Sequence, residues 1–196
     1  MNTYLGAGEY LSVKDLNENS ISDAKILYME GYLWDKTSSK EAFLHAAKLN
    51  KESGGLNAIS LSDVFCVEMH RESFIDFIKS DIDFVFCNEE ELNALFEKNT
   101  TTESIQHFQK SFPNIKQLIC TQGSEGVLIL DGGKQHNFNA TEAIVIDKTG
   151  AGDFFAGGYL FGLQKGLTLT ESAEIANKSA AHVISEIGVR PKNKFN

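Results

Sequence analysis

Basic residues are the scarcer of the two kinds of charged side chain in this sequence. Its 196 residues include 18 lysines and arginines but 27 aspartates and glutamates, which gives a formal net charge of -9. A surface that binds nucleic acid usually has a basic face, so this composition argues against one. Small anions whose charge is masked by a metal ion remain compatible ligands.

Cysteine is also scarce, and no apolar run is long enough to cross a bilayer. Cys66, Cys87 and Cys120 form no C-x-x-C pair, and the five histidines show no H-x-x-x-H or H-E-x-x-H spacing, so a zinc site is not indicated. With no recognisable secretory signal, three cysteines favour reduced structural thiols and a soluble, cytoplasmic protein. The composition, 42% hydrophobic and 23% charged, fits one globular domain over residues 1–196.

Strand-like and helix-like segments alternate along the chain. Strands are expected at 26–30, 57–61, 82–87, 118–121 and 143–146, and a hairpin at 127–138. Helices are expected at 40–51, 68–79, 89–97, 103–111, from Asp153 onward, and at 170–187. This alternation predicts an α/β fold, a doubly wound and mostly parallel sheet with helices on both faces. Such sheets bind ligands beyond the carboxyl ends of their strands.

The segment VIDKTGAGDFFAGGYLFGLQKG, residues 145–166, places glycines and a lone carboxylate between an expected strand and an expected helix. Gly150, Ala151 and Gly152 have almost no side chain, so their N–H groups can converge on an anion at the helix amino end. Asp153 follows directly and could accept a proton from a hydroxyl during phosphoryl transfer. A helix cap after a simple turn accounts for the same residues, because short glycine motifs often occur by chance.

Two other phosphate-binding motifs are excluded. The dinucleotide motif G-x-G-x-x-G needs a glycine where Phe155 stands, and no G-x-x-x-x-G-K-[ST] sequence occurs in the chain. The segment is therefore neither a nicotinamide-binding loop nor a P-loop.

Three motifs carry a resemblance to a known family. Residues 147–153, DKTGAGD, resemble the D-T-x-G-A-G-D-x-F signature of the ribokinase-like (PfkB) carbohydrate kinases, and Lys148 departs from it at the second position. Residues 88–91, NEEE, are similar to the N-x-x-E motif of that family, and residues 121–126, TQGSEG, to its T-x-G-x-x-G nucleotide segment. The opening residues Met1 to Ala7 resemble a strand found mid-chain in adenosine-kinase-like members.

The resemblance implies an ATP-dependent kinase that phosphorylates a hydroxyl of a sugar or nucleoside. It assigns proton abstraction to Asp153 and charge stabilisation to Gly150, Ala151 and Gly152. It further assigns the nucleotide to Thr121, Gly123, Gly126 and Asn177, Mg²⁺ through water to Asn88 and Glu91, and a monovalent cation, often K⁺, to Asp147 and Thr149. The implied partner is a small molecule, with no nucleic acid or membrane.

Several of these residues also fit simpler structural roles. Asn88 followed by three glutamates makes a good helix amino-terminal cap, which alone is the more natural interpretation. Residues 121–126 also fit an ordinary turn between strands, and Asn177 fits an exposed polar position on a helix.

The resemblance also predicts that the chain lacks the first third of a family member, including a small β lid. The kinase hypothesis therefore stands beside a second one, a non-catalytic remnant or nucleotide-binding module. A different doubly wound enzyme, such as a methyltransferase, would leave the Asp153 loop unexplained.

Overall fold

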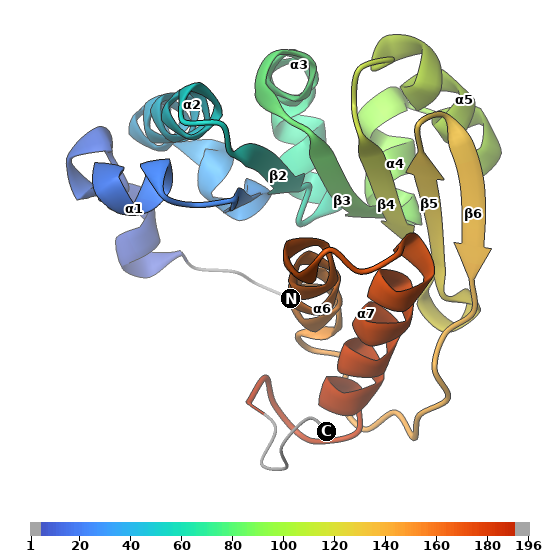
Figure 1. Ribbon diagram of the computed structural model, residues 1–196. Helices are drawn as coiled ribbons and strands as arrows, with labels where there is room; N and C mark the ends of the chain where they lie inside the picture. Colours follow the sequence, from blue (N-terminus) through green and yellow to red (C-terminus); the bar gives the residue numbers. More distant parts are fainter. Residues whose placement is uncertain (1–4, 191–196) are drawn as a thin grey trace. The chain divides into compact units, whose positions relative to one another are not determined.

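The structure is a computed structural model that describes residues 5–190, and they divide into two compact units (Figure 1). Within the described residues, the first unit runs to Cys120 and also includes Leu130–Lys134. The second unit contains Thr121–Ile129 and the residues from Gln135 onward. The single domain expected over residues 1–196 stays a prediction.

The described residues contain a six-stranded sheet in the order β1 to β6. The strands are Ile26–Glu30 (β1), Leu56–Ser60 (β2), Phe84–Asn88 (β3), Gln117–Thr121 (β4), Val127–Asp131 (β5) and Lys134–Phe138 (β6). β1, β2 and β3 pair in parallel, with Ile26 opposite Leu56 and Ala58 opposite Phe84. Gly132 and Gly133, both with positive φ, close the predicted hairpin between β5 and β6. The predicted α/β fold with a mostly parallel sheet is confirmed.

In the first unit, helices connect the parallel strands, as βαβ crossovers require. The α-helices are Glu18–Ser22 (α1), Thr37–Glu52 (α2), Val64–Asp81 (α3), Glu89–Phe96 (α4) and Thr101–Ser111 (α5), with short 3₁₀ segments at Gly6–Tyr10, Val13–Asp15 and Gly31–Asp35. Trp34 anchors the core: its ring stacks on Phe77 at 4.6 Å between centroids, and its Nε1 donates to Ser73 Oγ at 2.9 Å. Such a buried aromatic stack contributes both apolar area and a satisfied polar group.

The second unit is built on two helices, Ala151–Lys165 (α6) and Leu169–Ile184 (α7), with a 3₁₀ turn at Gly123–Glu125 (η4). The two helices pack closely because α6 presents glycines to α7. A Cβ on Gly158 would lie 2.6 Å from Ser179 Oγ, and one on Gly162 would lie 2.5 Å from Ser172 Oγ. These glycines therefore bring the helix axes nearer than any larger residue would allow.

Three expectations about this fold are wrong. The strand expected at 143–146 does not form within the described residues: the Ile146 and Asp147 N–H groups both donate to the carbonyl oxygen of Ile184, at the end of α7, and not to a neighbouring strand. α6 begins at Ala151, two residues before Asp153, because Gly150 adopts a left-handed conformation (φ 84°) that serves as the cap. The final helix stops at Ile184, not 187.

The strand-like resemblance at Met1 to Ala7 falls partly outside the described residues. Met1 to Tyr4 are not described, and Gly6 and Ala7 belong to a 3₁₀ helix, so the described part of that prediction is wrong. Cys66, Cys87 and Cys120 form no disulfide within the described residues, and Cys87 and Cys120 are buried, as expected. Burial raises the pKa of the half-buried Cys66 thiol to about 11, which makes it unreactive near neutral pH.

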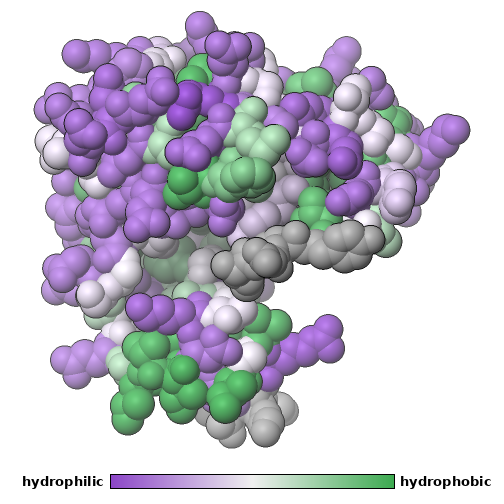
Figure 2. Space-filling view, turned by 180° about the vertical axis from the view of Figure 1, so that it is seen from behind, coloured by the Kyte–Doolittle hydropathy of each residue, from purple (hydrophilic) through white to green (hydrophobic). Residues whose placement is uncertain are grey.

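Apolar side chains are exposed in the second unit. Ile144, Val145, Ile146, Phe161, Ile187 and Val189 each expose 47% or more of their surface. In the view of Figure 2, apolar side chains cluster in the lower part, with smaller apolar areas elsewhere. Contiguous exposed apolar surface of this kind often marks a binding or interaction surface.

Candidate active site

The turn at 121–126 has a geometry that only glycine permits at its end. The Gln122 N–H donates to the Gly126 carbonyl at 2.8 Å, which closes the turn between β4 and β5. Gly126 has φ 103°, and a Cβ there would collide with the Phe138 carbonyl oxygen and lie 2.6 Å from the Ala140 nitrogen. The T-x-G-x-x-G segment is thus pressed against the chain that leaves β6, which fixes the position of both.

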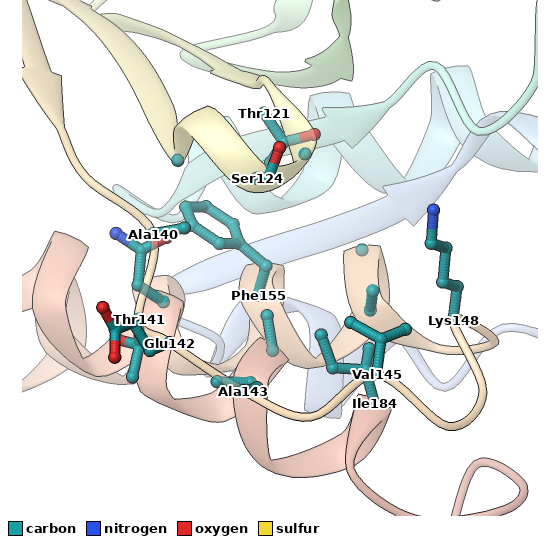
Figure 3. Close-up of a pocket in the computed structure, with 17 residues that line it drawn as sticks. Thr121, Ser124, Ala140, Thr141, Glu142, Ala143, Val145, Lys148, Phe155 and Ile184 are labelled. Atoms are coloured by element: carbon teal, nitrogen blue, oxygen red, sulfur yellow. The ribbon is translucent and has the colours of Figure 1, made fainter.

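A cavity of about 690 Å³ lies within the second unit, against this turn (Figure 3). It is lined by the 121–126 turn, the 140–152 segment, Phe155 of α6, and Asn177, Ala180, Ala181 and Ile184 of α7. Its middle is apolar: Phe155 and Val145 face the cavity in Figure 3, together with Ala143 and Ile184. The volume falls in the range of small-molecule sites, and an apolar lining with a few polar groups is typical of them.

Hydrogen bonds to Asp147 hold in place the loop that forms one end of this cavity. Its Oδ1 accepts from the Thr149 N–H at 3.0 Å and from Thr149 Oγ1 at 2.7 Å, and its Oδ2 accepts from the Gly188 N–H at 3.0 Å. These bonds, the Thr149 backbone bond foremost, hold the pKa of Asp147 below its usual value. The loop that leads into α6 is therefore held both by a bond within the loop, to Thr149, and by a bond to Gly188, which follows α7.

The amino end of α6 has no side-chain cap. The Ala151 N–H donates to the Lys148 carbonyl at 3.2 Å, so one of the three amides expected to bind an anion is used inside the turn. Gly152 lines the cavity, and a Cβ built on it would meet no atom within 4 Å. An uncapped helix amino end beside open space is a suitable anion site, because its N–H groups and dipole both favour negative charge.

Asp153 is the third residue of α6 and is exposed. It directly follows Gly152 but does not itself line the cavity. The carboxylate therefore lies in the first turn of α6 and is in contact with solvent.

Asn177 is buried on α7 and lines the cavity. Its Nδ2 donates to the Asn139 carbonyl at 3.0 Å. The alternative that Asn177 is an exposed helical residue is therefore wrong. A second hollow of about 330 Å³, which Asn177 also lines, is bordered by residues that include Glu174 and Lys178.

Asn88 and Glu91 belong to the first unit and form a reciprocal cap at the start of α4. The Glu91 N–H donates to Asn88 Oδ1 at 2.8 Å, while Asn88 Nδ2 donates to Glu91 Oε1 at 2.7 Å. Burial raises the pKa of Glu91 to about 7, with the Asn88 backbone bond opposing it and the charges of Asp63 and Glu90 adding to it. The capping role is confirmed; the magnesium role stays a prediction.

Two kinds of feature are absent from the described residues. No group of three or more His, Cys, Asp or Glu side chains there has a geometry that could hold a metal ion. Among helices within residues 5–190, none combines the length and apolar character that a membrane span requires.

The model of the pfkB family of carbohydrate kinases matches residues 1–195. The chain belongs to this family. The pfkB match spans the motifs at 88–91, 121–126 and 147–153 that first suggested it.

Solved and curated pfkB-type proteins resemble the chain over almost its whole length. A probable sugar kinase from Rhizobium etli is 36% identical with a TM-score of 0.93, and an adenosine kinase from Sinorhizobium meliloti is 35% identical with a TM-score of 0.93; each match covers 98% of this chain. The adenosine kinase of Schizosaccharomyces pombe is 25% identical over 98% of this chain.

The chain is shorter than these pfkB relatives. It spans 58% and 59% of the two solved proteins and 62% of the curated adenosine kinase. A ribokinase from Lactococcus lactis is 37% identical over 59% of this chain and 35% of its own length.

The structure brings together the predicted nucleotide residues Thr121, Gly123, Gly126 and Asn177 with Ala151 and Gly152 around one cavity. It also reveals cavity residues that the sequence did not indicate, among them Phe155, Val145 and Glu142. The sequence pattern marks Phe155 and Val145 only as parts of a helix and a strand. Lys148 also lines the cavity, and the sequence does single out this residue, because it departs from the family signature.

Proposed function

We propose that the chain binds ATP in the 690 Å³ cavity and transfers its γ-phosphoryl group to a hydroxyl of a sugar or nucleoside. The observation that carries this proposal is the meeting of an apolar cavity with the uncapped amino end of α6. The first suits a planar base and the second suits a phosphate. The matching family and the names of the relatives agree with this assignment.

The base would occupy the apolar part of the cavity. Phe155 and Val145 provide surface there, and Asn177 provides a polar group whose Nδ2 is already bound to Asn139. Asn177 Oδ1 is therefore the atom that can accept a hydrogen bond from an amino group of the base. The turn at 121–126 would bound the nucleotide on its other side.

The phosphate groups would lie at the amino end of α6. Backbone N–H groups of Gly150 and Gly152 would stabilise the charge on the transferred phosphoryl oxygens. Asp153 would accept the proton of the attacking hydroxyl, and correct positioning would supply most of its effect.

Mg²⁺, when bound, would mask part of the phosphate charge. Asn88 and Glu91 would order this ion through bound water, because Mg²⁺ commonly keeps several of its waters and the oxygens of both side chains already accept hydrogen bonds in the cap of α4. A ribokinase-like protein of Escherichia coli, 21% identical to this chain, has been solved with ATP and Mg²⁺. We extend the proposal to a monovalent cation, such as K⁺, at Asp147 and Thr149.

The experiment is to measure ADP release by the purified chain with Mg-ATP and K⁺, in the presence of adenosine, other nucleosides, ribose, fructose or 2-keto-3-deoxygluconate. Wild-type protein should release ADP with at least one acceptor, and the Asp153→Asn variant should lose this release while binding Mg-ATP with nearly unchanged affinity. Replacing K⁺ with a large organic cation tests the monovalent site.

Two other results would overturn parts of the proposal. Nucleotide binding without ADP release, from folded wild-type protein, would favour the nucleotide-binding module over the kinase. Equal loss of binding and transfer in Asp153→Asn would show that Asp153 is not the proton acceptor.

A further inference from the structure

Lys148 lines the cavity from the loop that precedes α6. In Figure 3 its side chain stands on the opposite side of the cavity from Thr141 and Glu142, with Val145 and Ile184 between them. Ala151 and Gly152, at the amino end of α6, line the same cavity. Lys148 therefore lies at the end of the cavity that adjoins the amino end of α6, where the helix dipole favours negative charge.

Lys148 is the one positively charged side chain among the described residues that line the cavity, and Glu142 is the one negatively charged. Lys148 forms no ion pair with any residue in the range 5–190. Among the lysines in the range 5–190, only Lys36 and Lys48 form ion pairs with acidic side chains, so Lys148 is set apart by its place on the cavity and not by its lack of an acidic partner. Its charge is available to a ligand.

The backbone of Lys148 is held in place on both sides. Asp147 is bonded to Thr149 and Gly188, and the Lys148 carbonyl accepts from the Ala151 N–H at 3.2 Å. Only the side chain needs to become ordered when a ligand binds, so a contact made by its amino group costs little beyond the entropy of that side chain.

We propose that Lys148 binds the polyphosphate of the nucleotide and adds a positive charge that the family signature, with threonine at this position, does not supply. This inference rests on the proposed nucleotide site. It assigns a specific role to a side chain that distinguishes this chain from the D-T-x-G-A-G-D pattern. Because the contact is with phosphate and not with the base, its contribution should grow with the number of phosphates.

The test measures dissociation constants of AMP, Mg-ADP and Mg-ATP by calorimetric titration of the full chain. Lys148→Met removes the charge and keeps the length of the side chain, and Lys148→Arg keeps the charge. The matched control is Lys165→Met, which removes one positive charge at the other end of α6, where Lys165 lies over the Phe161 ring.

Lys148→Met should weaken Mg-ATP binding by roughly three- to tenfold, Mg-ADP by less, and AMP by less than about twofold, because an exposed charge pair in water is worth about 1 kcal/mol. Lys148→Arg should restore the affinity. The difference between wild type and Lys148→Met should shrink at high salt.

Three outcomes would overturn the inference: equal weakening for AMP and ATP, no weakening for any nucleotide, or the same weakening in Lys165→Met. These results differ from failure of the proposed function. If wild-type protein binds no nucleotide, the site itself is wrong; if it binds Mg-ATP and Lys148→Met binds it equally well, only the role of Lys148 is wrong.

Discussion

Asn177 donates a hydrogen bond from its Nδ2 to the carbonyl oxygen of Asn139, which joins α7 to the chain that leaves β6. The Asn177 side chain is only 7% exposed. A carbonyl oxygen can only accept, so the contact determines which end of the amide faces Asn139. This hydrogen bond therefore holds part of the cavity wall in place and also sets the orientation of Asn177 Oδ1, the atom proposed to bind the base.

Replacing Asn177 with aspartate should destabilise the protein. The change places a carboxylate oxygen against the Asn139 carbonyl oxygen and removes the donor, which should lower the free energy of unfolding by about 2 kcal/mol. Urea denaturation measures this. Lys178→Ala, at the next and exposed position, should change it by less than about 0.5 kcal/mol. An unchanged unfolding free energy in Asn177→Asp would mean that the Asn139 contact contributes nothing.

Alanine at Gly126 should damage the fold because its Cβ has no room. Gly133 provides the matched control: it also has positive φ, but a Cβ there meets no atom within 4 Å. Gly133→Ala should cost about 1 kcal/mol through backbone strain alone, and Gly126→Ala should cost at least about 3 kcal/mol through strain plus collision. Equal unfolding free energies for the two variants would contradict the close approach of the 121–126 turn to Phe138 and Ala140.

Valine at Gly152 should weaken nucleotide binding without unfolding the protein. Its side chain would enter the open space beside the cavity, where a phosphate is proposed to lie. The affinity for Mg-ATP should fall at least about tenfold, since a hydrogen bond from a backbone N–H to a charged phosphate oxygen is worth about 1.5 kcal/mol or more. Gly157→Val is the control on the same helix, because a Cβ there also meets no atom within 4 Å and Gly157 does not line the cavity. If both variants bound Mg-ATP equally, the phosphate would have to lie elsewhere.

The stability of the chain should depend on the ionisation of Glu91. The pKa of this carboxyl is raised from 4.5 to about 7 in the folded state, so between these values the folded protein holds a proton that the unfolded chain has released. The free energy of unfolding should therefore fall as pH rises from 4.5 through 7, by about 3 kcal/mol at most, and then level off.

Glu91→Gln should remove most of this pH dependence and raise the unfolding free energy at pH 8. Urea denaturation across the pH range gives the profile. Glu90→Gln removes the same charge from the exposed neighbouring position. Because the charge of Glu90 is the smallest of the influences that raise the pKa of Glu91, this change should shift the profile only slightly to lower pH. A wild-type profile that is flat between pH 5 and 8 would show that Glu91 is ionised with little cost. Added Mg²⁺ that selectively stabilises wild type above pH 7 would support the proposed metal role.

Sequence patterns located most strands of the sheet well because short apolar runs of strand length, bounded by turn residues, are typical of strands. Ile26–Glu30 matched the observed β1 at both ends, and the Asp131-Gly132-Gly133 turn was located correctly. The segment at 143–146, Ala-Ile-Val-Ile, misled the prediction because a β-branched apolar run is typical of a strand, whereas here Ala143 and Val145 line the cavity and the segment is largely exposed.

Short sequence motifs predicted only part of the candidate site. Gly123, Gly126 and Gly152 could be predicted as site residues because each is a glycine of a short, recognisable motif. Phe155, Val145 and Ile184 line the cavity through tertiary packing, which no local pattern records. The bond between Asn177 and Asn139 joins residues 38 positions apart and could be seen only in three dimensions.

Around Val145 the wall of the cavity is a segment of chain that belongs to no helix or strand. Val145 lines the cavity and exposes 51% of its surface, while Ile144 and Ile146, which do not line it, expose 82% and 57%. A backbone without strand partners is restrained mainly by what lies on its two sides. Whatever fills the cavity should therefore slow amide hydrogen exchange in this segment, and whatever binds the outer isoleucines should alter the shape of the space within.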